Sequence, residues 1–283
     1  GFSARALFGL LGSDDVTLKV SPNGSAFFDA FVIDRETGRT EFPEPVILPG
    51  HSAVPAVPPA GKLALYGRQR AGAPWLEVLR PTGRDFPLQP HTGLNRIGTW
   101  APSTSTTIVA QGIPLTSIGT ISHPALSAAS LLTSSRRWRA TSAATANSVV
   151  DQRSALTGCW RGNAAGLGGF TLITRISLTT LQPTGIGFFG LLASVAALAT
   201  TTVLSALVEA IGLGFERGTH TNWQLVRNDA TGAPTLVDLG AGFPVATAGL
   251  ITLTIWCPAA GSSFWLRAVN EQTGAVFEQE VTT

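Results

Sequence analysis

The chain has 283 residues, of which 44% are hydrophobic and only 13% are charged, with 31 glycines and 18 prolines. This composition is typical of a β-rich protein with many turns, and it excludes a disordered chain and a coiled coil. The formal net charge is +2, and the cations are scattered except for Arg136, Arg137 and Arg139 around Trp138. Since no nucleic-acid-binding motif surrounds that group, we favour a solvated or ion-paired role for it over contact with nucleic acid.

Residues 1–42 predict an N-terminal β-hairpin region for attachment or oligomerisation. Val16, Leu18 and Val20 alternate with polar residues, residues 21–24 form a Ser-Pro-Asn-Gly turn, and residues 26–33 return. A second turn is expected over residues 34–39. Residues 43–61 contain six prolines, and they predict an extended, semi-rigid connector because proline cannot join the middle of a sheet.

Residues 62–130 predict a small β unit followed by an intertwined shaft. Leu63 and Leu65 precede an Arg-Gln-Arg-Ala-Gly-Ala-Pro turn, and Trp75, Glu77 and Leu79 follow it, all at period-two spacing. So little apolar material does not hold an isolated hairpin folded in water. We therefore expect partner chains to cover the hairpin, and we expect the Ser/Thr/Ala/Ile-rich stretch 103–130 to pack against other copies of the chain.

Residues 131–283 predict an antiparallel β-sandwich. Strand-like segments are separated by Gly, Pro, Asn or Asp turns, as in sandwiches. The expected strands lie at 170–178, 186–192, 210–216, 222–229, 235–240, 250–257 and 263–270. About 150 residues are enough to bury a core.

The uncharged run 186–208 is long enough to cross a bilayer. Thr200, Thr201, Thr202 and Ser205 interrupt it, and no Lys or Arg cluster flanks it. By period it divides into a buried strand over 186–192, a short helix over 193–207 and a strand over 211–215. We therefore place the run in a globular core, without membrane insertion.

The cysteines and histidines predict neither a metal site nor a cofactor. Cys159 and Cys257 belong to no metal-binding cluster, and we favour two buried free thiols while their pairing stays open. The four histidines show no ligand spacing; they are His51, His91, His123 and His220. The chain contains no methionine, which predicts a fragment or a processed form.

No catalytic residues are expected. A glycan-cleaving enzyme would need two carboxylates that flank the scissile bond. Turn and surface roles account for the available ones, namely Asp151, Glu209, Glu216, Asp229, Asp238, Glu271, Glu278 and Glu280. The sequence also contains no nucleophile elbow and no phosphate-binding loop.

Two loops carry chemistry suited to binding sugars, because sugars pair an apolar face with a ring of hydroxyl groups. Tryptophan supplies a stacking surface, and Arg, Asn and His supply directional hydrogen bonds. The candidate ligand-binding residues are Trp160, Arg161 and Asn163 in one loop and Arg217, His220, Asn222 and Trp223 in the other. Core packing is the alternative for Trp160 and Trp223, since both lie next to predicted strands, and it is the preferred role for Trp256 and Trp265.

The block GKLALYGRQRAGAPWLEVLRPTGRDFPLQPHTGLNRIGTWAPSTSTT resembles a central segment of tail-fibre proteins from phages and prophages of alphaproteobacteria. The segments NSVVDQRSALTGCWRGNAAGLGGFTLITRISL, GFERGTHTNWQLVRNDATGAPTLVDLGAGFP and VNEQTGAVFEQEVTT resemble the lectin-like sandwich that ends many such fibres. The resemblance covers most of residues 61–283 and includes no catalytic signature. It implies a trimeric fibre whose terminal domain contacts the host surface. Such sandwiches usually continue further, so we expect the last strands to be missing after Thr283.

The sequence thus predicts an all-β protein with an N-terminal intertwined, trimeric β-rich shaft and a lectin-like sandwich that carries one short helix. The expected function is non-enzymatic attachment of a virion to its host through multivalent glycan binding. The expected partners are two further copies, other tail or baseplate proteins at the N-terminal region, and a host-surface glycan. The protein would be made in the bacterial cytoplasm and reside in the tail fibre. A glycan-depolymerising spike and a structural head-fibre or decoration protein remain alternatives.

Overall fold

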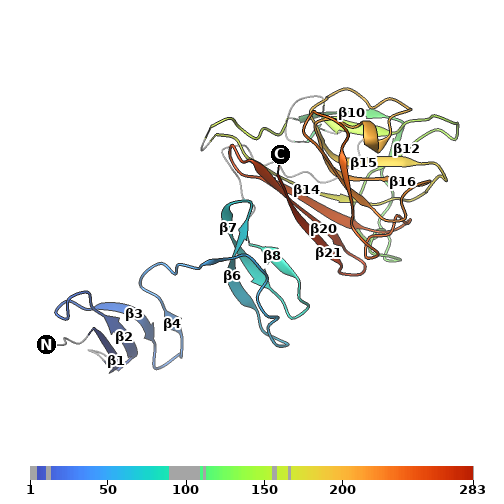
Figure 1. The fold of residues 1–283 in the computed structure, drawn as a ribbon. Coiled ribbons are helices and arrows are strands. Elements are labelled where there is room, and N and C mark those ends of the chain that lie inside the picture. The colour runs from blue at the N-terminus through green and yellow to red at the C-terminus, as the bar shows by residue number, and fades with distance from the viewer. Residues whose placement is uncertain are drawn as a thin grey trace. The chain divides into compact units, whose positions relative to one another are not determined.

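The computed structural model describes residues 5–10, 14–88, 109–110, 113–154, 158–164 and 167–282. These residues form β-strands and loops, with a single turn of 3-10 helix at Leu204–Ala206. The chain divides into two compact units, Gly1–Pro49 and Gly50–Thr283, and Figure 1 labels their strands. The expected all-β class is confirmed.

The first unit is one antiparallel sheet with the strand order β1-β2-β3-β4. Its strands are β1 (Ala6–Leu10), β2 (Val16–Val20), β3 (Phe28–Ile33) and β4 (Thr40–Glu41). The turn between β2 and β3 is closed by Ser21 Oγ, which accepts a hydrogen bond from the Gly24 N–H at 2.7 Å. Asp34 closes the next turn by accepting the Thr37 N–H at 2.7 Å. Both turns lie where Asn, Asp and Ser side chains predict them.

The second unit contains the expected sandwich of two antiparallel four-stranded sheets. One sheet has the order β14-β19-β20-β21, with β14 (Phe170–Ile176), β19 (Ile251–Cys257), β20 (Ser263–Asn270) and β21 (Val276–Thr282). The other has the order β15-β16-β17-β18, with β15 (Ile186–Leu192), β16 (Ala210–Glu216), β17 (Gln224–Asn228) and β18 (Thr235–Asp238). All seven strands expected between residues 170 and 270 are present.

The inner faces of these two sheets form one hydrophobic core. Leu213 and Leu225 of one sheet and Leu253 and Leu266 of the other are fully buried in it. Trp223 belongs to the same core, with its ring edge-on to Phe215 at 5.1 Å between centroids. Alternate residues of each strand therefore supply the core, as period-two patterning predicts.

The prediction of a short helix over 193–207 is wrong. A single 3-10 turn, Leu204–Ala206, forms in that segment. Four consecutive β-branched residues, Thr200-Thr201-Thr202-Val203, disfavour an α-helix there. Leu204 packs instead on the outer face of the sheet, against Val226 of β17. No helix in the described residues has the length and apolarity needed to cross a membrane.

A third sheet lies on the outer face of the sheet that contains β20 and β21 (Figure 1). Its order is β5-β6-β7-β8, with β5 (Gly50–His51), β6 (Ala64–Arg70), β7 (Ala73–Leu79) and β8 (Asp85–Pro87). The hairpin expected around the Arg-Gln-Arg-Ala-Gly-Ala-Pro turn is therefore present. Its inward residues are Tyr66, Arg68 and Arg70 on β6 and Trp75, Glu77 and Leu79 on β7. Leu63 and Leu65 remain 66% and 55% exposed, so on the first strand the buried face is the polar one.

The cover that the hairpin needs comes from the same chain. Trp75 meets Trp256 edge-on at 4.9 Å and Trp265 at 5.7 Å between ring centroids. The Arg70 guanidinium lies over the Trp265 ring at 4.0 Å from its centroid. The tryptophans of β19 and β20 thus bury the hairpin face that the sequence alone assigned to partner chains.

Strand pairing also joins residues on both sides of the domain boundary expected near residue 130. β10 (Ile113–Ile118) pairs with β9 (Val109–Ala110) and β13 (Asp151–Ser154), and β11 (Thr120–Ser122) pairs with β12 (Arg139–Thr141). Arg153 Nε donates to the Val195 carbonyl at 2.8 Å, which ties β13 to the loop after β15. Residues 89–108, where part of the intertwined shaft was expected, lie outside the described residues.

Candidate functional site

The loop before β14 presents an aromatic side chain to solvent. Trp160 is 51% exposed, and Arg161 and Asn163, which follow it, are exposed as well. The carbonyl groups of Trp160 and Arg161 both accept the Gly169 N–H, at 3.0 and 3.1 Å. The Arg161 carbonyl also accepts the Ala260 N–H at 2.8 Å. The backbone that carries the tryptophan is therefore fixed to the sandwich at two points.

Glycines make this tight loop possible. Gly162 has a φ of +92°, and a Cβ atom there would lie 1.7 Å from the Leu167 carbonyl oxygen. Gly168 has a φ of +83°, and its Cβ would lie 2.5 Å from the Gly162 nitrogen. Only glycine combines this backbone conformation with such close approach. The backbone that carries Trp160 is consequently restricted, which reduces the entropy lost when a ligand binds.

The second predicted loop uses its polar side chains to maintain its own structure. His220 Nδ1 accepts the Glu216 N–H at 3.1 Å, and Arg217 Nη1 donates to the Val245 carbonyl at 3.3 Å. Asn222 Nδ2 donates to Asp238 Oδ1 at 3.1 Å. These contacts hold the loop in position.

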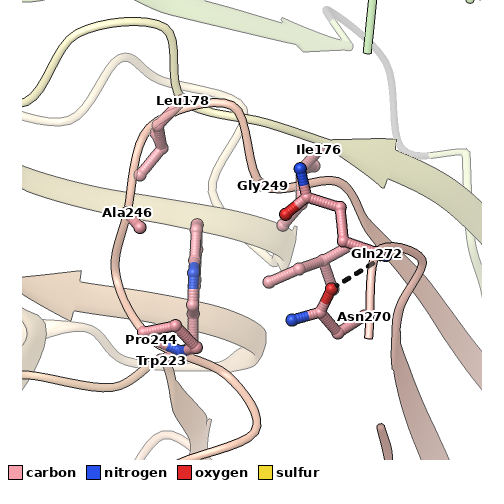
Figure 2. A pocket seen from close by; sticks show the side chains of 9 residues that line it. Ile176, Leu178, Trp223, Pro244, Ala246, Gly249, Asn270 and Gln272 are labelled. Carbon is pink, nitrogen blue, oxygen red and sulfur yellow. Dashed lines mark hydrogen bonds between the residues drawn. The ribbon is translucent and has the colours of Figure 1, made fainter. Parts of the chain in front are cut away.

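Trp223 packs in the core of the sandwich, which is the alternative role considered for it. The side chain is 3% exposed, and its ring borders a small cavity together with Ile176, Pro244 and Gln272 (Figure 2). The cavity has a volume of about 30 Å³, which accommodates one or two water molecules but not a sugar ring. Asn270 beside it accepts the Gln272 N–H at 3.0 Å, a contact that stabilises the turn after β20.

The two predicted loops lie at opposite ends of the sandwich. The Trp160 loop leads into Phe170, the first residue of β14, whereas Trp223 lines the cavity with Ile176, the last residue of that strand. A strand advances about 3.4 Å per residue, so the two ends are about 20 Å apart. The seven candidate residues therefore do not form one site, and the loop that carries Trp160, Arg161 and Asn163 is the better candidate.

The cysteines are free thiols in the structure. Cys257 is buried and Cys159 is half-buried. Burial raises the pKa of Cys257 to about 11 and also raises the pKa of Cys159, so both are poor nucleophiles at neutral pH. Among the described residues, no group of three His, Cys, Asp or Glu side chains could hold a metal ion.

Several of the carboxylates considered for hydrolysis have structural contacts. Asp229 accepts Thr231 Oγ1 at 2.9 Å and Asp238 accepts the Gly240 N–H at 2.6 Å, and these hydrogen bonds lower the pKa of both carboxyls. Both residues therefore serve turns. Glu278, in contrast, is part of a larger network.

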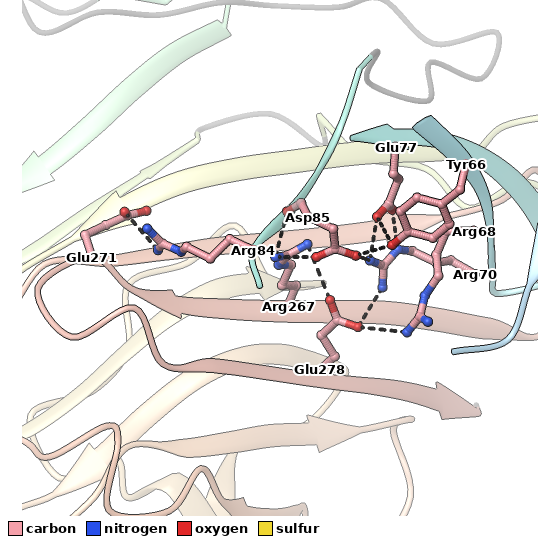
Figure 3. Close-up of polar contacts among 9 residues, drawn as sticks. All are labelled: Tyr66, Arg68, Arg70, Glu77, Arg84, Asp85, Arg267, Glu271 and Glu278. Carbon is pink, nitrogen blue, oxygen red and sulfur yellow. Dashed lines mark hydrogen bonds and ion pairs between the residues drawn. The ribbon is translucent and has the colours of Figure 1, made fainter. Parts of the chain in front are cut away.

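Sequence reasoning missed a network of charged residues between the hairpin sheet and the sandwich (Figure 3). Its members are Tyr66, Arg68, Arg70, Glu77 and Asp85 on the hairpin sheet and Arg267 and Glu278 on the sandwich. We call this set the buried charge network. Arg70 forms a two-pronged pair with Glu77, at 2.8 and 3.2 Å, and reaches Glu278 at 2.7 Å. Arg267 reaches Asp85 at 2.9 Å.

Burial separates the pKa values of the two hairpin carboxyls. Glu77 is fully buried, and burial, together with the neighbouring Asp85, raises its pKa to about 7. Burial also acts to raise the pKa of Asp85, but hydrogen bonding with Glu77 and the charge of Arg267 outweigh it and lower that pKa to about 2. The pKa of Tyr66 is raised by its burial and by its 2.8 Å hydrogen bond to Asp85. The ion pairs of the network join the hairpin sheet to the sandwich.

A signal for this network was present in the sequence. Tyr66, Arg68 and Arg70 recur at period two, as do the residues opposite them on β7. The residues opposite them are Glu77, Trp75 and Ala73, so one carboxylate faces two arginines, and the surplus positive charge indicates that this face needs a complementary partner. The sequence does not identify that partner, because Arg267 and Glu278 lie about two hundred residues further along the chain.

Comparison of the chain with family models, with curated proteins and with solved structures found no match. The structure alone thus gives the fold class: an all-β chain whose two-sheet sandwich carries a third sheet on one outer face.

Proposed function

We propose that this chain is a phage tail-fibre protein that attaches the virion to its host by binding a surface glycan at several identical sites. The observation that carries the proposal is the half-exposed Trp160, held in a fixed loop beside the exposed Arg161 and Asn163. A flat aromatic surface stacks on the apolar face of a sugar, while guanidinium and amide groups bind its hydroxyls. The resemblance of residues 61–283 to tail-fibre segments supports the same proposal.

Because identical sites are repeated on one particle, a single weak aromatic site per chain is sufficient for attachment. A shallow site with one aromatic ring binds weakly, but linking several sites on one rigid particle raises avidity by factors of about 10² to 10⁴. The partners in this proposal are further copies of the chain in a homotrimer, other virion proteins and the host glycan. No nucleic acid, membrane or cofactor takes part.

The test is binding of the full chain to host cells and to a panel of their surface glycans, for the wild type and for Trp160→Ala. Loss of a stacking contact worth about 1–2 kcal/mol weakens each site about 5- to 30-fold. Trp160→Phe retains an aromatic face and should keep part of the binding.

The matched control is His220→Ala at the other end of the sandwich, which should bind as the wild type does. Equal binding by Trp160→Ala and the wild type would contradict the proposed site. Release of reducing sugar from the glycan would indicate a depolymerising spike. Absence of any saturable binding would indicate a structural decoration protein.

A further inference from the structure

Register places apolar side chains from three neighbouring strands on one face of the N-terminal sheet. Phe8 of β1 is opposite Leu18 of β2, which is opposite Phe31 of β3. The rings of Phe8 and Phe31 lie 6.4 Å apart between centroids, which agrees with a shared face. We call this surface the N-terminal apolar face; it comprises Ala6, Phe8, Leu10, Val16, Leu18, Val20, Phe28, Phe31 and Ile33.

The opposite face of the same sheet has a different character. Leu7, the neighbour of Phe8, lies there opposite Lys19. Lys19 pairs with Asp29 of β3 at 3.0 Å, and the same face carries the buried Thr17. The charged residues of β2 and β3 thus lie on one face of the sheet, and the positions of β1, β2 and β3 on the other face are all apolar. Thr40 of β4 lies at the edge of that apolar face, opposite Ile33.

No described residue of the first unit buries the N-terminal apolar face. Phe8, Leu10 and Phe28 are 68%, 64% and 57% exposed. Among the described residues 5–10 and 14–49, not one apolar side chain is buried. A sheet of this kind needs a hydrophobic layer on one face to be stable, and an exposed continuous apolar surface marks an interaction site.

We propose that the N-terminal apolar face is a self-association surface that packs against the same face of further copies of this chain. The exposed parts of its nine side chains amount to about 500 Å² per copy. Two copies together would bury about 1,000 Å², which reaches the area that a stable protein interface needs. Two twisted sheets pack face to face in this way about 10 Å apart.

A second copy fits this surface better than an unrelated partner does. The described positions of this face carry no charged side chain, and Thr40 of β4, opposite Ile33, supplies a hydroxyl group at its edge, so the face offers little that would orient a different protein. A closed symmetric assembly covers the same patch on every copy at once and leaves none exposed. The inference deepens the proposed multivalent attachment and rests on it, but its test measures mass instead of glycan binding, so either can fail while the other stands.

The test is the solution mass of the full chain, by light scattering, for the wild type and for two double variants. One variant is Phe8→Glu with Phe28→Glu, and the other is Phe8→Lys with Phe28→Lys. The wild type should have a multiple of the 29.4 kDa chain mass, and each double variant should have the monomer mass at the same concentration. Mixing the two variants should restore assembly, because opposite charges then meet across the interface.

Leu7→Glu is the matched control, since it adds the same charge one residue away on the opposite face, and it should assemble as the wild type does. A monomeric wild type at the highest soluble concentration would overturn the proposal. So would unchanged assembly of both double variants. If the variants are monomeric but their mixture does not assemble, the face contacts something other than itself, and the proposal is equally overturned. Hydrogen exchange in β2 shows that each variant retains a folded N-terminal sheet.

Discussion

The N-terminal sheet (β1–β4) and the β5–β8 sheet differ in the chemical character of the face that each one offers for packing. The β5–β8 sheet directs Arg70, Glu77 and Trp75 inward. Arg70 pairs with Glu77 beside it and with Glu278 of the sandwich, and Trp75 packs against Trp256 of the sandwich. The N-terminal sheet directs the apolar side chains of β1, β2 and β3 to one face, and no described residue of its own unit covers it. Charged residues that need specific partners favour docking within the chain, whereas we propose that the apolar face packs against another copy of itself.

Among substitutions that test this comparison, we expect the largest loss of stability at Arg70. Arg70→Ala removes the cation that pairs with Glu77 and Glu278. Glu278 keeps Arg68 and Arg267, but the fully buried Glu77 loses its two-pronged pair. We expect a loss of about 4 kcal/mol in the free energy of unfolding, measured with urea. Arg35→Ala is the control, because Arg35 pairs with Asp14 in solvent and such pairs contribute little. Equal losses for the two variants would contradict the assigned role of the network.

Removing the aromatic anchor of the hairpin sheet should have the next largest effect. Trp75→Ala leaves a cavity beside Trp256 and Trp265, and we expect a loss of about 3 kcal/mol in unfolding free energy. Trp160→Ala, at the exposed tryptophan, should leave the midpoint of thermal unfolding unchanged. If Trp75→Ala is as stable as the wild type, the hairpin sheet does not dock where the structure places it.

The buried charge network should make stability depend on pH. Folded Glu77 keeps its proton up to about pH 7, whereas an unfolded glutamate releases it near 4.5. The folded state therefore binds more protons in that window, and unfolding free energy should fall by up to about 3 kcal/mol as pH rises from 4.5 to 7. Asp85 acts in the opposite direction below pH 3.8, because its folded pKa is lowered. The free energy of chemical unfolding should thus have a maximum near pH 4. Glu77→Gln should flatten its decrease above that pH. A decrease that persists in Glu77→Gln must come from another group.

The smallest expected effect on stability concerns the Trp160 loop. Gly162→Ala strains a φ of +92° and places a Cβ against the Leu167 carbonyl, so we expect a cost of about 1–2 kcal/mol. Displacement of the loop should weaken glycan binding as much as Trp160→Ala does. Gly218→Ala is the control, because a Cβ at Gly218 meets nothing within 4 Å. Unaltered binding by Gly162→Ala would show that the loop need not be fixed.

Local pattern was sufficient to predict the strands of the sandwich. Segments such as 186–192 and 263–270 coincide with β15 and β20, because alternation along one strand reports which residues face the core. The helix expected over 193–207 failed because its apolar spacing reflects contact of Leu204 with the outer sheet face, and not helical periodicity.

Contacts between distant segments could not be predicted in the same way. The pairing of Arg70 with Glu278 and of Trp75 with Trp256 depends on how two sheets stack, and no local pattern contains that information. Likewise, Trp160 and Trp223 share a residue type that suits sugar binding, yet β14 separates their loops. Of the second loop, Trp223 lies in the core, whereas Arg217, His220 and Asn222 hold the loop itself. Trp160, Arg161 and Asn163 are exposed, and their role in binding stays a prediction.

The most direct test of the difference between the two sheets compares the full chain with a chain that starts at Gly50, each by light scattering. The shorter chain keeps the β5–β8 sheet on its sandwich, and we predict that it is a folded monomer. The full chain, which adds the N-terminal apolar face, should assemble. A shorter chain that assembles as the full chain does, or a full chain that stays monomeric, would contradict this account.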